Sequence, residues 1–115
     1  MEKRKYYRDV REHLKVLEER GKLRRITREI NKDTELMPLV RWQFRGLEEQ
    51  ERQAFLFENV VDVKGKRYTM PVTVGTLAAS TEIYSIGLMC EPEEIFDCWT
   101  QAQLKPIPPV VVESG

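Results

Sequence analysis

Apolar residues at helical spacing mark the first element of the chain. They recur three and four positions apart, at Val10, Leu14 and Leu17. This spacing places them on one face of a helix predicted over residues 10–20. Asp9 precedes that helix as an N-cap, and Gly21 stands where helices commonly end in a left-handed residue. A short strand, Leu23 to Ile26, is expected to follow.

A second helix is predicted to begin between Thr34 and Pro38 and to stop near Gly46. Asp33 signals its start, and its apolar positions keep the helical period. These positions are Leu36, Leu39, Val40 and Phe44. Pro38 is compatible with this helix only within the first turn, where its missing N–H is not needed. A polar connector over residues 47–53 should come next.

Two strands are predicted in the middle of the chain, at residues 54–60 and 70–74. A turn-like stretch over residues 62–66 separates them. Val72 and Val74 alternate with a threonine, as in a half-buried strand. Pro71 at the entry places the second strand at an edge, or early in its run.

The last third reads as a small-residue loop, two helices and the start of a strand. The loop covers residues 75–80, and a helix over about residues 81–89 follows with Ile83 and Ile86 as its apolar positions. Pro92 opens a second helix that ends before Pro106. Its expected inner face consists of Ile95, Trp99 and Ala102. The β-branched run Val110–Val112 has the pattern of a buried strand.

This order of elements predicts an α+β (mixed α/β) fold: helix, strand, helix, short strand pairs and two further helices. The length of 115 residues indicates a single domain over residues 1–115. With 41% hydrophobic and 33% charged residues, the chain is too apolar for a disordered protein. No apolar run reaches the ~18 residues of a membrane span. The charged start lacks a secretory apolar region, so we expect a cytoplasmic protein with no membrane partner.

Charge is zero overall but unevenly placed. Residues 1–30 hold eleven Lys and Arg against six acids, whereas residues 69–115 hold one Lys against six acids. A basic front end could bind nucleic acid or another anion. However, Glu12, Glu18 and Glu19 interrupt it, which favours an exposed, ion-paired helix docked on an acidic surface of the same protein. We therefore expect no nucleic-acid partner.

The reactive side chains suggest no complete catalytic centre. Cys90 and Cys98 are expected to be buried or half-buried free thiols, and a zinc site is disfavoured because His13 is the single histidine. His13 itself, on a charged helix, is expected to be exposed to solvent. We nominate no catalytic, cofactor-binding or metal-ligating residue.

Three further features leave alternatives open. The loop at residues 75–80 could bind an anion at a helix N-terminus, but a tight strand-to-helix connector is favoured. Glu58 and Asn59 could offer a carboxylate to a cleft, although capping of the following turn, or a hydrogen bond to it, is favoured. Trp42 and Phe44 could form an exposed anchor, although Phe44 also falls on the apolar stripe of its helix.

Five segments, in order, resemble the N-terminal region of UbiD-type decarboxylases. They are RDVREHLKVLEERGKLRRITREIN, DTELMPLVRW, AFLFENV, MPVTVGTLAASTEIYSIGL and PEEIFDCWTQAQLKPIPPVVVESG. The strand AFLFENV is the most characteristic of them, and the resemblance covers essentially the whole chain. It departs from the family pattern at Thr76, Ala78, Ala79 and Ile83, which indicates a divergent branch.

The resemblance implies a fold, a chemistry and partners. UbiD-type enzymes bind prenylated FMN with a divalent metal such as Mn²⁺ and with K⁺. They decarboxylate aromatic or α,β-unsaturated acids reversibly and without oxidation. Their catalytic and metal-binding residues lie outside the matched region, so this chain alone is expected to be structural and inactive, with no cofactor of its own.

The resemblance also implies a role for the last residues of the chain. Residues 105–115 would join this domain to a downstream flavin-binding domain, and the remainder of a homo-oligomeric decarboxylase would be its partner. The alternative is a free-standing accessory or binding subunit of a multi-component (de)carboxylase.

Overall fold

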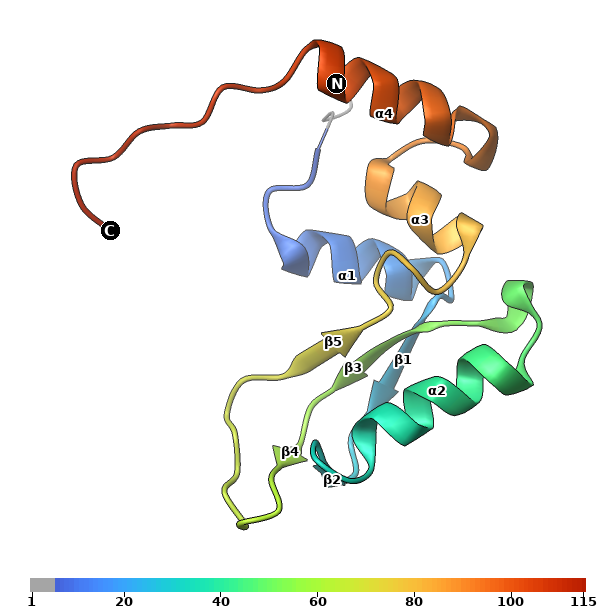
Figure 1. Ribbon diagram of the computed structural model, residues 1–115, viewed down its shortest axis with the longest axis vertical. Coiled ribbons are helices and arrows are strands. Elements are labelled where there is room, and N and C mark those ends of the chain that lie inside the picture. The colour runs from blue at the N-terminus through green and yellow to red at the C-terminus, as the bar shows by residue number, and fades with distance from the viewer. Residues whose placement is uncertain (1–5) are drawn as a thin grey trace.

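The computed structural model describes residues 6–115 and shows an α+β fold, as predicted (Figure 1). The helices are α1 (Val10–Glu19), α2 (Leu36–Gly46), α3 (Thr81–Leu88) and α4 (Ile95–Leu104). The strands are β1 (Leu23–Ile26), β2 (Ile30–Asn31), β3 (Ala54–Phe57), β4 (Val60–Val61) and β5 (Val72–Val74). Short 3₁₀ turns, η1 (Glu49–Glu51) and η2 (Pro92–Glu94), precede β3 and α4. No helix within residues 6–115 is long and apolar enough to cross a membrane.

Strand β3 is the centre of the main sheet. It pairs in parallel with β1, with Leu23 opposite Ala54, and antiparallel with β5, with Phe57 opposite Val72. A second pair, β2 and β4, continues the parallel arrangement in a two-stranded sheet. Parallel strands need a long crossover, and α2 lies in the connection between β1 and β3.

The two faces of β3 build two separate apolar cores. Because side chains alternate along a strand, Ala54 and Leu56 face one side and Phe55 and Phe57 face the other. The first core contains residues of α1, β1, α3 and the loop before α3: Leu17, Leu23, Ala79, Ile83 and Ile86. The second contains residues of β2, α2 and β4: Ile30, Leu36, Val40 and Val60. The molecule is therefore layered, with helices on both sides of a small sheet.

The predicted helix boundaries hold, and the two acidic residues before α1 and α2 make different contacts. Asp9 caps α1 by accepting a 2.8 Å hydrogen bond from the Arg11 N–H, and α2 begins at Leu36, which places Pro38 in its first turn. Asp33 does not cap α2. Its carboxylate accepts a hydrogen bond from the Val63 N–H instead, because the turn after β4 lies against it.

The predicted buried faces of α1 and α4 need correction. Val10 is exposed, so the burial of α1 begins further along the helix and is complete only at Leu17. In α4, Ile95 is half-buried but Trp99 and Ala102 are exposed. The reason is that α4 packs on α3 along one narrow side, and no other element in the described part of the chain covers it.

The strand predicted at Val110–Val112 does not form within residues 6–115. After Leu104 the chain leaves the body as an extended, exposed segment (Figure 1). The three valines pair with no strand there, so they form no strand although β-branched residues favour one.

Candidate functional site

His13 of α1 is half-buried against α3, which corrects the prediction that it is exposed to solvent. Its ring stacks on Tyr7 with centroids 5.1 Å apart, and the Tyr7 hydroxyl donates to the Ile86 carbonyl. Its Nε2 atom is buried and has no hydrogen-bond partner in the described structure. Burial lowers the pKa of His13 from its ordinary value of 6.5. The environment therefore favours the neutral imidazole.

The loop before α3 is a tight connector, as favoured by the sequence. Gly75 has a φ of 78°, and a Cβ added there would lie 3.4 Å from the Cβ of Ala79. The Ser80 hydroxyl caps α3 by accepting from the Ile83 N–H at 3.1 Å. The loop thus brings the start of α3 close to the sheet.

A carboxylate of the chain itself occupies the N-terminus of α3. Glu49 Oε1 accepts hydrogen bonds from the Thr81 N–H at 2.7 Å and from the Thr81 hydroxyl at 2.8 Å. These bonds lower the pKa of Glu49. Because helix N-termini attract anions, this carboxylate takes the place that an external anion would need.

Two buried polar connections near this point were not predicted. The Arg52 guanidinium donates to the carbonyls of Ala79 and Phe44, and it lies 5.3 Å from the centre of the Phe44 ring. The Gln43 side chain pairs with the backbone of Gln53 through two hydrogen bonds of 2.7 and 2.8 Å. Gln43 stands on the apolar period of its helix, three residues after Val40 and seven after Leu36, so its spacing indicated burial although its side chain is polar. Arg52 lies in the polar connector, where no apolar period marks it.

The basic stretch is held in ion pairs within the described residues. Arg25 bridges Glu18 of α1 and Glu58 after β3. The hydrogen bond from Arg25 lowers the pKa of Glu18. Asn59 accepts a hydrogen bond from Arg67, directly after the turn at residues 62–66, whereas Glu58 pairs with Arg25 of β1.

The basic stretch also forms an ion pair with the acidic C-terminal part of the chain. Lys22 lies 3.2 Å from Glu82 of α3, which agrees with the predicted docking of this stretch on an acidic surface of the same protein. The first five residues of the basic stretch fall outside the described residues.

Cys90 and Cys98 are half-buried free thiols, as predicted. Burial and the neighbouring Cys98 raise the pKa of Cys90 to about 11, so its thiol stays protonated at neutral pH. Among residues 6–115, no three His, Cys, Asp or Glu side chains gather in a way that could hold a metal ion.

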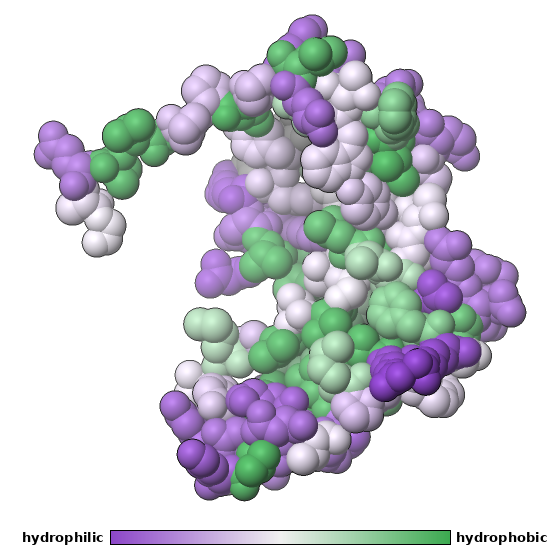
Figure 2. Space-filling model, viewed as in Figure 1, coloured by the Kyte–Doolittle hydropathy of each residue, from purple (hydrophilic) through white to green (hydrophobic). Residues whose placement is uncertain are grey.

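An open apolar groove of about 960 Å³ runs along α2. Its floor is built by Val40, Phe44, Val74, Gly75 and Ala78, and Met37, Trp42, Arg41 and Arg45 line it from α2. Trp42 is 62% exposed, whereas Phe44 packs against the cores. Apolar side chains gather over this part of the molecule, between β5 and α2 (Figure 2). Of the two aromatic residues, Trp42 is therefore the exposed one, and Phe44 belongs to the apolar stripe.

Comparison with known families decides the relationship. The sequence model of the 3-octaprenyl-4-hydroxybenzoate carboxy-lyase N-terminal domain (UbiD_N) matches residues 14–102, more than three quarters of the chain. The chain belongs to the UbiD family. No solved structure gives a significant match to this UbiD-family domain.

The N-terminus of α3, which the sequence suggested as an anion site, is not free to bind a flavin phosphate in this UbiD-family domain. The N-terminus of α3 is filled by Glu49, and the nearby Arg52 is directed at backbone carbonyls. The exposed apolar surfaces of this domain are the groove on α2 and the uncovered side of α4.

Proposed function

We propose that this chain is the N-terminal part of a carboxy-lyase that reversibly and non-oxidatively decarboxylates aromatic or α,β-unsaturated carboxylic acids with prenylated FMN. The observation that carries the proposal is the family match over residues 14–102. In this proposal the substitutions at Thr76, Ala78, Ala79 and Ile83 mark a divergent branch.

The role of this segment within the enzyme is structural. Its two apolar cores are complete, whereas its α2 groove and the outer side of α4 remain uncovered. Uncovered apolar surface of this kind is typical of contact sites between domains or subunits. The flavin-binding and C-terminal parts of the decarboxylase are its proposed partners, reached through the segment at residues 105–115.

The cofactors belong to the rest of the enzyme. Prenylated FMN, Mn²⁺ and K⁺ would supply the electron sink and its phosphate-bound metal there. The free thiols Cys90 and Cys98 support a reducing compartment, and we place the enzyme in the cytoplasm.

The test has two arms. The isolated chain is mixed with prenylated FMN and Mn²⁺ and passed through a gel-filtration column, and we expect no flavin absorbance to elute with it. The reading frame beyond codon 115 is then determined, and its whole product is assayed for CO₂ release from aromatic and α,β-unsaturated acids.

Activity of the whole product that depends on the flavin would support the proposal. Stoichiometric flavin retention by the isolated chain would contradict the structural role. A stop codon directly after Gly115 would contradict the proposal and favour a free-standing accessory subunit of a multi-component (de)carboxylase.

A further inference from the structure

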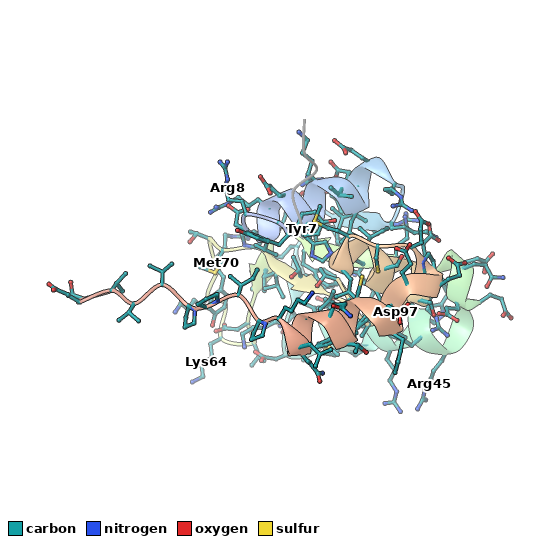
Figure 3. The ribbon with its side chains drawn as sticks, turned by 90° about the horizontal axis from the view of Figure 1, so that it is seen from above. Tyr7, Arg8, Arg45, Lys64, Met70 and Asp97 are labelled. Carbon is teal, nitrogen blue, oxygen red and sulfur yellow. The ribbon has the colours of Figure 1, made fainter. Side chains whose placement is uncertain are left out.

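Cys90 and Cys98 lie where the end of α3 meets the start of α4. Cys90 follows Met89, whose left-handed φ of 57° ends α3, and its N–H donates a 3.1 Å hydrogen bond to the Ser85 carbonyl. Cys98 belongs to α4. Viewed from above, α4 crosses the front of the molecule, and Asp97, directly before Cys98, lies on it (Figure 3). Hydrogen-bonded backbone therefore holds both thiols in place.

The junction between the two helices fixes Cys98 relative to α3. Helix α4 packs mainly on α3 and on η2. The Trp99 ring stacks on Tyr84 of α3 with centroids 6.5 Å apart, and its Nε1–H donates to the Tyr84 hydroxyl. In the turn between the helices, the Glu94 carboxylate accepts a 3.2 Å hydrogen bond from the Glu91 N–H. The side of α4 that carries Cys98 is thus set by contacts on either side of it.

The two thiols are neighbours in space as well as in sequence. Both are free and half-buried, and Cys98 lies within hydrogen-bonding reach of the Cys90 thiol. Two cysteines whose side chains already touch need little backbone movement to reach disulfide geometry. An open cavity of about 380 Å³ beside Cys90, bordered by Arg20 and Met89, gives small solutes access to the pair.

We propose that Cys90 and Cys98 form a reversible disulfide by exchange with a small disulfide such as oxidised glutathione. The Cys98 sulfur, on losing its proton, attacks one sulfur of glutathione disulfide. That S–S bond breaks, a mixed disulfide forms on Cys98, and one glutathione leaves with the proton. The Cys90 sulfur then attacks the Cys98 sulfur, and the second glutathione leaves with the Cys90 proton. Two protein thiols are thereby oxidised by two electrons, and one glutathione disulfide is reduced to two thiols.

The order of the two steps follows from the state of Cys90. Burial and the Cys98 side chain raise the pKa of Cys90 to about 11, so its thiol is protonated at neutral pH and Cys98 is the first to attack. The product would join α4 covalently to the end of α3. The redox state of the pair would therefore decide how firmly α4 is held on the body. This inference does not depend on the proposed flavin chemistry.

The first test measures the equilibrium between the dithiol and the disulfide in mixtures of reduced and oxidised glutathione. The whole chain is equilibrated without oxygen, once folded and once in concentrated urea, and its free thiols are alkylated and counted by mass spectrometry. The unfolded chain shows what a separation of eight positions gives by itself. Because the fold holds the thiols together, their effective concentration should be about ten-fold or more higher in the folded chain. An equal or lower value would overturn the proposal.

The second test is the change in stability that is linked to the first. A ten-fold preference for the disulfide in the folded state corresponds to about 1.4 kcal/mol, and the oxidised chain should be more stable than the reduced chain by this amount. Urea unfolding of both forms, followed by circular dichroism, gives the difference. An unchanged or lower midpoint in the oxidised chain would contradict the proposed cross-link.

A matched control moves one thiol to the other side of α4. Cys98→Ser with Thr100→Cys shifts the thiol by two residues, about 200° around the helix, to an exposed position. The separation from Cys90 hardly changes, so the unfolded chains should behave alike. The control should show no gain in effective concentration on folding, and circular dichroism verifies that it folds. A gain equal to that of the native pair would show that the fold does not place Cys98 against Cys90.

Discussion

His13 shows how one residue depends on contacts that its sequence neighbours do not reveal. It lies on a helix with charged neighbours, yet its ring is enclosed by Tyr7 and the start of the α3 C-terminal turn. The period of α1 could not show this, because Tyr7 lies before the helix and Gly87 is 74 positions away in sequence. Gly87 lies beside the imidazole, where an added Cβ would be in ordinary contact with Nε2 at 3.5 Å but would collide with Cδ2 of Leu77.

The stability of the protein should therefore depend on the protonation of His13. Its pKa is lowered in the folded state by burial, so the unfolded chain takes up the proton first as pH falls. Stability should be fully present above pH 6.5 and should decline as pH falls from there toward the lower folded-state pKa. Urea unfolding between pH 7.5 and about 5 should show this decline in the wild type and a shallower one in His13→Gln.

A direct measurement can contradict this prediction. His13 is the single histidine, so the imidazole proton signals in an NMR titration report on it alone. A midpoint at or above 6.5 would show that burial does not control its protonation.

Glu49 should stabilise α3 as an anion. Glu49→Ala removes the acceptor of the Thr81 N–H and hydroxyl, so the thermal unfolding midpoint at pH 7 should fall. Because the hydrogen bonds from Thr81 lower its folded-state pKa, its contribution is present above pH 4.5 and is lost as pH falls below that value. The deficit of the variant should accordingly shrink in acid.

Glu48→Ala is the matched control. Glu48 is exposed, precedes Glu49 and has no side-chain partner among the described residues. Differential scanning calorimetry of both variants gives the comparison. An equal effect of the two substitutions would mean that Glu49 does not support α3 at its N-terminus.

At the scale of elements, the local sequence pattern located the helices along the chain but did not show which residues pack against them. Helical spacing located α1, α2 and α3. The first-turn rule for proline predicted a start of α2 between Thr34 and Pro38, and the helix begins at Leu36. The buried face of α4 was wrong because periodicity shows which residues could be covered, not what is available to cover them. The environment of Asp33 was equally hidden: it signals the start of α2, but its carboxylate accepts from the Val63 N–H, which comes from a turn 30 positions later.

The connector between β5 and α3 should be sensitive to a single methyl group. The reference substitution is Gly65→Ala, in the turn at residues 62–66. It places a side chain at a φ of 83° with no atom within 4 Å, so the only cost to stability comes from the left-handed backbone, about 1–2 kcal/mol. Gly75→Ala has a similar φ and also brings its Cβ to 3.4 Å from Ala79 and 3.9 Å from the Ala54 Cα. It should be the more destabilising substitution.

Urea denaturation of the two variants measures the difference between them. A greater loss for Gly75→Ala would reflect the close approach of the connector to β3. Equal losses, or a smaller one at Gly75, would show that Ala79 moves aside freely and that the approach is not tight.

At the scale of the whole molecule, the sequence predicted an α+β domain and its family, and the structure confirms the fold class. The interaction surfaces could be predicted only in part. Trp42 was recognised as a possible anchor, but the groove beside it needs Val74 and Ala78 from a distant segment. No local pattern states that β5 will lie beside α2, because that placement follows from its pairing with β3.

The body of the domain should not depend on residues 105–115 for its stability. That segment is exposed throughout and adds nothing to either core. A chain ending at Leu104 should therefore unfold at the same urea concentration as the full chain, measured by far-UV circular dichroism at low protein concentration. A clearly lower midpoint would show that the segment packs on the body.

The parallel pairing of β1 with β3 has a consequence for synthesis on the ribosome. Leu23 pairs with Ala54, so 31 further residues must be made before the first strand meets its neighbour. At translation rates of about 5–20 residues per second this takes roughly 2–6 s, during which α1 and α2 have no sheet to cover their apolar sides. The nascent chain is thus most open to chaperones and proteases before AFLFENV emerges, and that segment is the one that lets the fold close.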